Sequence, residues 1–269
     1  MTAEASTRTV LLTGAEGLIG SIVRSRLRDR YTFRNLTRHE EPFSDVVGDI
    51  GDPDVAKRAI VGADAVLHLA GASAVESSWD DVLHSNIVGT RNIFEAARDA
   101  GVGHVVLAST NHVVGEYEVE FGPSAYATGL RPGLSVDVPP RPDSLYGVSK
   151  AFGEALGRYY ADRFGIHVIC LRIGSVRSDD DPTAPSELAI EPWASFDEAT
   201  RRRRQAAVWL SQRDCAGLIA AALDAREVRW GVVYGVSANE GRFWDLAPGE
   251  RLLGWRPMDG ARVLPEAAT

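Results

Sequence analysis

Six apolar runs recur along the chain, and amphipathic segments separate them. The runs are VLLTG, FRNLTR, AVLHLAG, VVLAST, VICLRIG and VVYGV. They are nearly uniformly apolar, as strands buried on both faces are, whereas DDVLHSNIVGTRNIFEAARDAG has the amphipathic pattern of a helix. This alternation predicts an α/β fold, and because crossovers are right-handed, the expected sheet is a Rossmann-type, doubly wound parallel sheet.

The alternation is interrupted in two places. Residues 116–143 are rich in Gly and Pro, and residues 176–203 are acidic at first and basic afterwards. Long irregular segments in compact domains are usually functional, so both are predicted to be loops covering a site at the carboxyl ends of the strands. The expected core is residues 1–175 with 205–235 returning to it, and the expected small C-terminal substrate lobe is residues 176–204 and 236–269.

Composition and charge narrow the class of protein. Of the 269 residues, 45% are hydrophobic and 25% are charged, which is ordinary for a globular chain. No apolar run approaches the roughly 20 residues that cross a bilayer, and the start, MTAEASTR, lacks the apolar segment of a signal peptide. The net charge of −8 disfavours nucleic acid, and Cys170 and Cys215 cannot form a disulfide framework. We expect a cytoplasmic protein that binds no membrane, nucleic acid or metal.

A glycine motif follows the first apolar run. In TVLLTGAEGLIG, Gly14, Gly17 and Gly20 stand at three-residue intervals before a helix-competent segment. Gly14 permits a tight turn, Gly17 lets a phosphate approach the backbone, and Gly20 lets the helix pack on the strand. The amides at the start of that helix then face the phosphate with roughly half a positive charge. Glycine-rich turns without ligands are common, but with the downstream residues the motif predicts a dinucleotide site.

A second motif joins a phenol to an ammonium group. In LYGVSKAFGE, Tyr146 and Lys150 are four residues apart and so lie on one face of a helix. A phenol has a pKa of about 10, and a neighbouring ammonium group is expected to lower it toward the range of a useful base. Such a pair also arises by chance on amphipathic helices. Thr110, which ends the preceding strand in VVLAST, favours the catalytic interpretation because it can hydrogen-bond the reacting oxygen.

By TGAEGLIG, HLAG, NIVGT and YGVSK, the chain resembles the extended short-chain dehydrogenases/reductases over almost its whole length. The resemblance implies that Tyr146 is the general base or acid, that Lys150 lowers its pKa, and that Thr110 orients the substrate oxygen. Asn86 would complete a catalytic tetrad. The residues implied to contact the dinucleotide are Gly14, Gly17, Leu18, Ile19, Gly20, Asp49, Ile50, Leu69, Ala70, Gly71, Tyr146 and Lys150.

The chain is similar in particular to the uronate dehydrogenases and the archaeal glucose-6-phosphate dehydrogenases, through STNHVVGEY, LRIGS, VWLSQRDC, SANE and LGWRP. This similarity implies oxidation of a cyclic sugar at its anomeric carbon to a lactone. Arg204 matches the arginine that pairs with a uronate carboxylate, as the planar guanidinium fork suits. The other implied substrate contacts are Ser73, Thr110, Asn111, His112 and Ser175.

Several of these residues have simpler interpretations. Three of the arginines in the run 201–204 are predicted to be solvated, with Arg204 alone in the site. His112 could instead be a neutral histidine bonded to the backbone at a strand end, and Ser73 and Ser175 could be ordinary loop serines. The tryptophans Trp209, Trp244 and Trp255 are predicted to be packing residues.

The sequence departs from the resemblance where the second apolar run ends. Thr37 and Arg38 stand where the uronate enzymes have an acid that accepts from the ribose hydroxyls. Hydrogen-bond donors and a positive charge there suit a 2′-phosphate, so we predict NADP as the favoured cofactor, with NAD as the alternative.

The leading hypothesis is an NAD(P)-dependent dehydrogenase of an acidic sugar, hexuronate before glucose 6-phosphate. A nucleotide-sugar epimerase or dehydratase would use the same tetrad, and a non-catalytic NAD(P)-binding sensor would keep only the glycines. The resemblance also implies a homodimer that pairs the helices containing residues 86–98 and 146–160.

Overall fold

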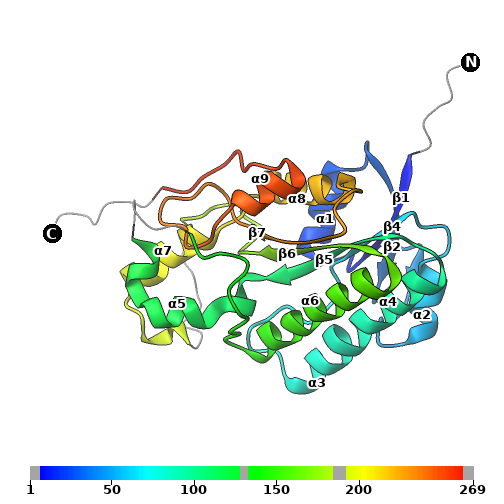
Figure 1. The fold of residues 1–269 in the computed structure, drawn as a ribbon, viewed down its shortest axis with the longest axis horizontal. Coiled ribbons are helices and arrows are strands. Elements are labelled where there is room, and N and C mark those ends of the chain that lie inside the picture. The colour runs from blue at the N-terminus through cyan, green and yellow to red at the C-terminus, as the bar shows by residue number, and fades with distance from the viewer. Residues whose placement is uncertain (1–6, 128–132, 184–191, 263–269) are drawn as a thin grey trace, which may run out of the picture.

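Seven parallel strands form the centre of the described part of the chain, residues 7–127, 133–183 and 192–262 of a computed structural model (Figure 1). Their order is β3-β2-β1-β4-β5-β6-β7, so the winding of the chain reverses between β1 and β4. The bounds are Arg8–Thr13 (β1), Tyr31–Thr37 (β2), Val46–Val47 (β3), Ala65–His68 (β4), His104–Thr110 (β5), His167–Ile173 (β6) and Trp230–Gly235 (β7). The doubly wound Rossmann-type sheet is confirmed. Only β3 was not predicted, because two residues carry no readable pattern.

Helices cover both faces of the sheet. Figure 1 shows α2, α3, α4 and α6 on one side of it and α1, α8 and α9 on the other. The α-helices are Leu18–Arg26 (α1), Pro53–Ala59 (α2), Trp79–Asp81 (α3), Thr90–Asp99 (α4), Gly115–Phe121 (α5), Leu145–Phe164 (α6), Glu198–Val208 (α7), Gln212–Asp224 (α8) and Ala247–Leu253 (α9). A π-helical turn, Val82–Gly89 (η1), joins α3 to α4, and the 3-10 turns are Asn111–Val114 (η2), Gly122–Tyr126 (η3) and Trp193–Ser195 (η4).

The alternation of side chains along each strand gives the sheet two apolar cores. In β5, Val106 and Ala108 pack in the core under α1 and α8, whereas Val105 and Leu107 pack in the core under α2, α4 and α6. A strand whose two faces are both buried must be apolar at every position, which is why the sequence runs were nearly uniform.

The helix that carries Tyr146 has defined ends. At the start of α6 the side chain of Ser144 accepts a hydrogen bond from the amide of Gly147. At its end Gly165, with φ of 72°, adopts the left-handed conformation that glycine reaches at least cost.

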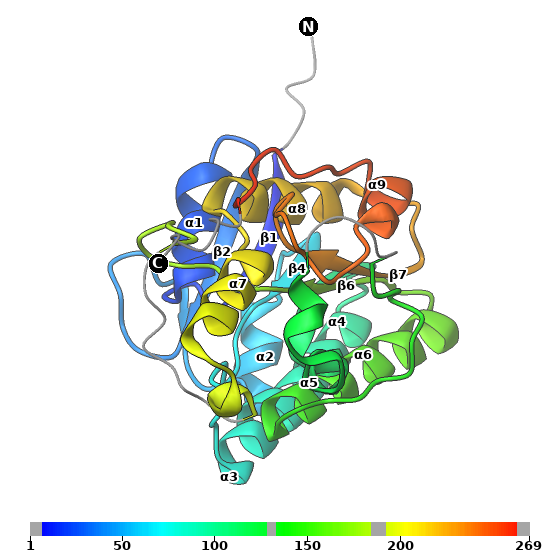
Figure 2. The same ribbon diagram turned by 90° about the vertical axis from the view of Figure 1, so that its left-hand side faces the viewer.

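Residues that follow β5 share an apolar core with parts of the expected small lobe. A third apolar core combines Val113, Tyr126, Val208 and Trp244, so residues that follow β5 belong to it together with α7 and the segment after β7. Figure 2 shows α5 and α7 facing each other at this end of the molecule. In contrast, α9, which also falls within the expected lobe, packs on β7 and α8.

Both predicted loops contain helices. Residues 116–143 include most of α5 and all of η3, and residues 176–203 include η4 and the start of α7. Gly and Pro residues at these positions mark the boundaries of short helices. Gly122 caps the end of α5 and also begins η3, with Pro as the next residue. Residues 128–132 and 184–191 of these segments lie outside the described residues.

No helix in the described ranges is long and apolar enough to cross a membrane. Trp209, Trp244 and Trp255 are buried in apolar clusters, as predicted for packing residues, and Cys170 and Cys215 are buried free thiols.

Candidate active site

A cleft of about 870 Å³ runs along the carboxyl edge of the sheet, from the end of β2 to α7. This volume lies within the range of small-molecule and cofactor sites. The predicted site residues that line it are Gly14, Gly17, Leu18, Ile19, Gly20, Thr37, Arg38, Asp49, Ile50, Leu69, Ala70, Gly71, Ser73, Thr110, Asn111, His112, Tyr146, Lys150, Ser175 and Arg204. The fold therefore brings together every predicted residue except Asn86.

The glycine loop packs so closely on its neighbours that two of its glycines have no room for a side chain. Gly14 has φ of 69°, and a Cβ on it would meet the backbone nitrogen of Ala70 at 2.8 Å. A Cβ on Gly20 would meet the carbonyl oxygen of Gly14 at 2.5 Å, so α1 packs closely on the loop. The first turn of α1 holds no acidic residue and no capping side chain, which leaves its amides for an anion. These features fit the pyrophosphate of a dinucleotide.

The loop after β4 is fixed from two sides. The hydroxyl of Thr13 accepts hydrogen bonds from the amides of Leu69 and Ala70, at 3.2 and 3.0 Å. On the other side Asn86, in η1, accepts from the amide of Ala72 at 2.7 Å and donates to its carbonyl oxygen at 2.9 Å.

Asn86 is thus bound to the backbone of the loop after β4. Its amide group also donates to the hydroxyl of Ser149 at 2.8 Å, and the side chain does not line the cleft. Its membership of a catalytic tetrad stays a prediction, because the observed contacts are those of a positioning residue that joins η1 to α6 and to the β4 loop.

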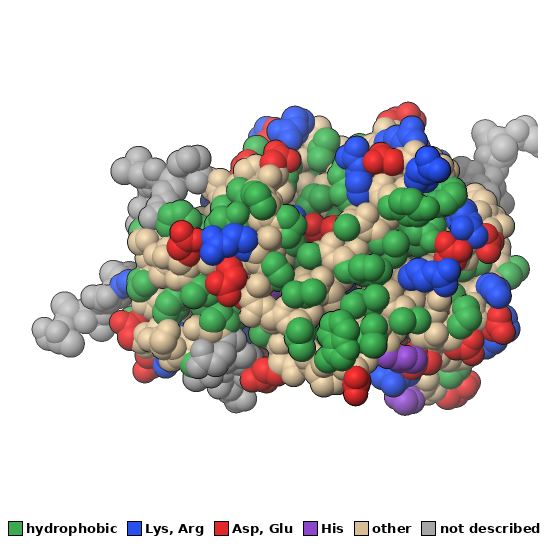
Figure 3. Space-filling view, turned by 60° about the horizontal axis from the view of Figure 1, so that its bottom comes forward, with side chains coloured by type: hydrophobic (Ala, Val, Ile, Leu, Met, Phe, Trp, Pro, Cys, Tyr) green, Lys and Arg blue, Asp and Glu red, His purple; other side chains and the backbone are tan. Residues whose placement is uncertain are grey.

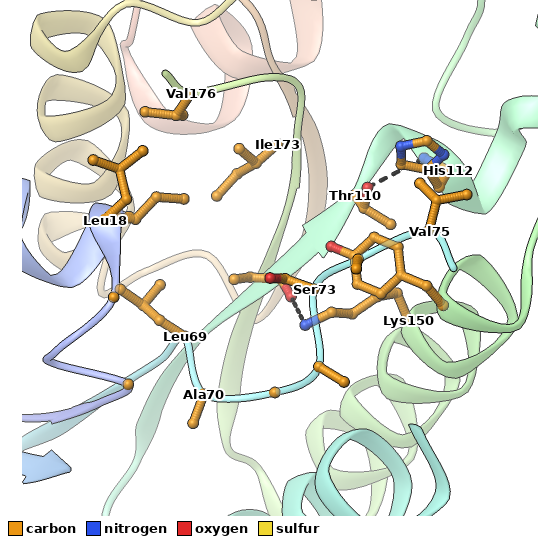
Figure 4. Close-up of a pocket in the computed structure, with 18 of the residues that line it drawn as sticks. Leu18, Leu69, Ala70, Ser73, Val75, Thr110, His112, Lys150, Ile173 and Val176 are labelled. Atoms are coloured by element: carbon orange, nitrogen blue, oxygen red, sulfur yellow. Dashed lines mark hydrogen bonds between the residues drawn. The ribbon is translucent and has the colours of Figure 1, made fainter. Parts of the chain in front are cut away.

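Thr110, Tyr146 and Lys150 meet in the middle of the cleft. Figure 4 shows Thr110 at the end of β5 and Lys150 reaching toward it from α6. The ammonium group of Lys150 donates to the carbonyl oxygen of Ala108 at 2.8 Å and lies 5.8 Å from the centre of the Tyr146 ring. The side chain of Thr110 is near enough to Tyr146 to act on its pKa, in the lowering direction. The arrangement places a proton acceptor, a hydrogen-bond partner and a cation around one point.

The electrostatics of this group differ from the prediction. Burial raises the pKa of Tyr146 to about 12, the hydrogen bond with Thr110 works in the lowering direction, and the Asp143 carboxylate adds to the rise. Burial also lowers the pKa of Lys150 to about 8. The net direction for the phenol pKa is therefore upward in this structure, because the loss of hydration outweighs the effects that lower it.

The cofactor end does not support the predicted preference for NADP. The hydroxyl of Thr37 is buried and lies 2.5 Å from the hydroxyl of Ser44. The guanidinium group of Arg38 is 3.5 Å from the carboxylate of Asp49, whose other oxygen is 3.0 Å from His84 Nε2. Glu16, which the sequence analysis passed over, lines this end of the cleft and binds the amide of Arg38.

Two buried carboxylates that no sequence pattern singled out lie behind the lining of the cleft near α7. Asp143 lies 3.0 Å from His112 Nδ1, so this histidine is paired with a side chain rather than with the backbone. Glu118, in α5, accepts from the amide group of Asn111 at 3.1 Å and from Arg204 Nε at 2.9 Å. A segment interpreted as a loop gave no reason to assign either acid a partner.

Arg204 itself has an unusual set of contacts. Its guanidinium group lies 3.7 Å from the centre of the Trp193 ring, and its Nη2 atom is buried without a hydrogen-bond partner among the described residues. Arg201, one turn earlier in α7, also lines the cleft and donates to the carbonyl oxygen of Phe196, so its predicted solvated state is wrong. Helical spacing brings positions 201 and 204 to the same face.

No group of three or more His, Cys, Asp or Glu residues in the described ranges could hold a metal ion.

Comparisons with known proteins agree with the fold and the glycine loop. The NAD-dependent glucose-6-phosphate dehydrogenase of Haloferax volcanii is 37% identical over 94% of both chains. The L-arabinose 1-dehydrogenase (NAD(P)(+)) of the same organism is 36% identical over 96% of this chain and 99% of its own. A solved mutant uronate dehydrogenase from Agrobacterium tumefaciens in complex with NAD is 32% identical, with a TM-score of 0.73 and coverage of 94% and 86%.

The family comparison covers most of the chain. Residues 10–227 match the NAD dependent epimerase/dehydratase family, and this range includes the glycine loop, Thr110, Tyr146 and Lys150. The chain belongs to the NAD dependent epimerase/dehydratase family.

Proposed function

We propose that this protein oxidises a cyclic sugar at its anomeric carbon, with a nicotinamide dinucleotide as the acceptor, and releases a lactone. The observation that carries the proposal is the meeting of Thr110, Tyr146 and Lys150 between a dinucleotide-shaped loop and a polar pocket. The bound dinucleotide would supply the hydride acceptor. The names of the relatives support sugar oxidation as the reaction class.

Each residue of this group has one task in the proposed reaction. Thr110 and Tyr146 hold the anomeric hydroxyl, and the Tyr146 oxygen takes its proton as the C–H bond gives up its hydride. The carbon is thereby oxidised to the carbonyl carbon of the lactone. Lys150, held by the carbonyl oxygen of Ala108, stays close to the phenolate that forms and stabilises its charge.

We propose an acidic sugar as the substrate, a hexuronate before a sugar phosphate. Arg204 lines the cleft and keeps a buried Nη2 atom without a partner, which could donate to a carboxylate that enters beside it. Ser73, Ser175 and His112 line the same region and could bind sugar hydroxyls.

A neutral aldose is the second candidate. Glu118 already compensates the charge of Arg204, which reduces its attraction for an anion, and one relative is named for the oxidation of L-arabinose.

The test is an assay of reduced cofactor formation with glucuronate, galacturonate, glucose 6-phosphate and neutral aldoses, each with NAD and with NADP. We expect turnover of an acidic sugar, and Tyr146→Phe should lower kcat by about 10²- to 10⁴-fold while binding the dinucleotide as the wild type does. Turnover of nucleotide sugars alone would instead favour an epimerase or dehydratase. Binding of the dinucleotide with no turnover of any sugar would favour the sensor.

The pH dependence follows from the raised pKa of Tyr146. A phenol with a pKa of about 12 is protonated at neutral pH, so the reactive base becomes more abundant as the pH rises. We expect kcat/KM for oxidation to increase from pH 7 to pH 8, the range in which Lys150, with its pKa of about 8, still carries much of its charge. Thr110→Val removes a contact that lowers this pKa and should displace the profile to higher pH. A plateau below pH 8 in the wild type would contradict the assignment.

We also propose the homodimer. The large apolar side chains that are exposed on α6 are Leu145, Val148, Tyr159 and Phe164, and η1 adds Leu83 and Val88. Figure 3 shows apolar side chains gathered over this face. Light scattering should give a dimer for the wild type and a monomer for Val148→Glu, whereas Val61→Glu, exposed elsewhere, should stay dimeric. A monomeric wild type would refute the proposal.

The cytoplasmic location stays a prediction, and localising the tagged protein in cells would test it.

A further inference from the structure

The part of the cleft beyond the glycine loop decides which dinucleotide can enter. NADP differs from NAD by a 2′-phosphate on the adenosine ribose, which sits at the end of the second strand in folds of this kind. A 2′-phosphate needs unoccupied donors or positive charge there, whereas a free ribose needs an acceptor for its hydroxyls. The contacts around the end of β2 distinguish these two cases.

The Thr37 and Arg38 side chains at the end of β2 both contact groups of the chain itself. The hydroxyl of Thr37 is paired with that of Ser44 at 2.5 Å, in a buried position. The guanidinium group of Arg38 lies 3.5 Å from the carboxylate of Asp49. A phosphate bound here would have to displace Ser44 from Thr37 and to compete with the Asp49 carboxylate for Arg38.

The backbone amide of Arg38 is occupied as well. It donates to Glu16 Oε1 at 2.8 Å, and Glu16 belongs to the glycine loop between Gly14 and Gly17. The turn at Gly14, which leaves β1 with φ of 69°, brings this side chain across to β2. The loop therefore places a carboxylate at the strand end where NAD-binding folds have an acid, although the strand itself ends in Thr37 and Arg38.

The charge at this end of the cleft is negative in consequence. Glu16 and Asp49 both line it, against the single cation Arg38 among the lining residues at the end of β2. Glu16 is exposed, so its carboxylate can reach a ligand without rearrangement of the core. Two carboxylates repel a phosphate that carries nearly two negative charges, and each can accept a hydrogen bond from a ribose hydroxyl.

We propose that Glu16 is the specificity-determining residue of the cofactor site, and that its carboxylate selects NAD over NADP in place of the acid missing from β2. The inference rests on the proposed function only in requiring that the cleft binds a nicotinamide dinucleotide. It reverses the preference predicted from Thr37 and Arg38, because those residues are counted as free donors in the sequence and are engaged in the structure.

The test is the direct binding of NAD and of NADP, each titrated by calorimetry into the full chain without sugar. The wild type should bind NAD at least tenfold more tightly than NADP. Glu16→Gln keeps the size of the side chain and removes its charge, so the ratio of the two dissociation constants should move at least tenfold toward NADP. Glu40→Gln, an exposed acid that does not line the cleft, is the matched control and should leave the ratio unchanged.

Arg38→Ala separates the two interpretations of this strand end. If Arg38 bound a 2′-phosphate, its loss would weaken NADP alone and shift the ratio of the two dissociation constants at least tenfold toward NAD, whereas with Glu16 in control the ratio stays close to that of the wild type. A wild type that prefers NADP, or a ratio that Glu16→Gln does not move, overturns the assignment of Glu16. Binding of neither dinucleotide to the wild type would instead refute the proposed function, and this inference with it.

Discussion

The chain has two buried ion pairs of the same kind, Arg172 with Glu154 and Arg204 with Glu118. They differ in how many of the guanidinium donors have hydrogen-bond partners. Arg172 of β6 donates through Nε and Nη2 to both oxygens of Glu154, at 2.9 and 2.8 Å, and through Nη1 to the hydroxyl of Tyr234. Arg204 of α7 makes one bond to Glu118 and leaves Nη2 without a partner in the described structure.

The two arginines also differ in their exposure to the cleft. Arg172 does not line the cleft and is 3% exposed, whereas Arg204 lines it and is 16% exposed. In both cases burial acts to lower the pKa of the guanidinium group, yet the partner carboxylate and the other groups nearby together raise the pKa above its ordinary value. We call a pair saturated when the guanidinium nitrogens have hydrogen-bond partners, and unsaturated when one of them has none. A saturated pair can only hold elements together, but an unsaturated pair beside a cavity retains a donor for a ligand. Counting unused donors thus distinguishes a structural pair from one available to a site.

The largest expected effect comes from breaking the saturated pair. Arg172→Met leaves the carboxylate of Glu154 buried without its cation, which should lower the free energy of unfolding by about 3–5 kcal/mol. Urea denaturation measures the loss, and Arg202→Met, which breaks an exposed pair with Glu198, should cost less than about 1 kcal/mol.

A second variant checks the cause of that loss. The double variant Arg172→Met with Glu154→Leu removes both charges and should recover most of the stability. A single variant as stable as Arg202→Met would show that the Arg172 pair does not hold β6 to α6.

Breaking the unsaturated pair should cost less stability and change the choice of substrate. In Arg204→Met, Glu118 keeps its bonds from Asn111 and from the Tyr126 hydroxyl, and we expect a loss of about 2 kcal/mol. If Arg204 binds an anion, kcat/KM for glucuronate should fall at least tenfold more than that for a neutral aldose. Equal losses for the two sugars would assign Arg204 to structure alone, as Arg172 is.

Sequence patterns predicted the parts of the molecule that local rules govern. The six long strands and the glycine loop follow from apolar runs and from spacing, and so do Tyr146 and Lys150, because one helix sets their distance. The partners of Arg204 and His112 could not be predicted. Glu118 and Asp143 reach them from other elements, and only packing of the lobe brings those elements together.

The same reason explains the error at the cofactor end. Thr37 and Arg38 are donors in any sequence, and whether they are free depends on Ser44, Glu16 and Asp49, which fold back from three other segments. Similarly, the pKa of Tyr146 was expected to follow its neighbour on the helix, but burial, which depends on the whole lobe, determines its direction. Charges and spacings are local properties, whereas hydrogen-bond saturation and burial are not.

The smallest expected effect tests Glu118 without breaking its geometry. Glu118→Gln keeps the side-chain shape but removes the charge that compensates Arg204, so the guanidinium group should attract an anion more strongly. Loss of the Glu118 charge should raise the ratio of kcat/KM for glucuronate to kcat/KM for a neutral aldose by about tenfold. This is equivalent to about 1.4 kcal/mol, a reasonable size for one charge at the effective dielectric of a partly buried site. Glu154→Gln, which changes the saturated pair, should leave that ratio unaltered. A ratio that moves equally in both variants would mean that the two pairs differ in contacts but not in function.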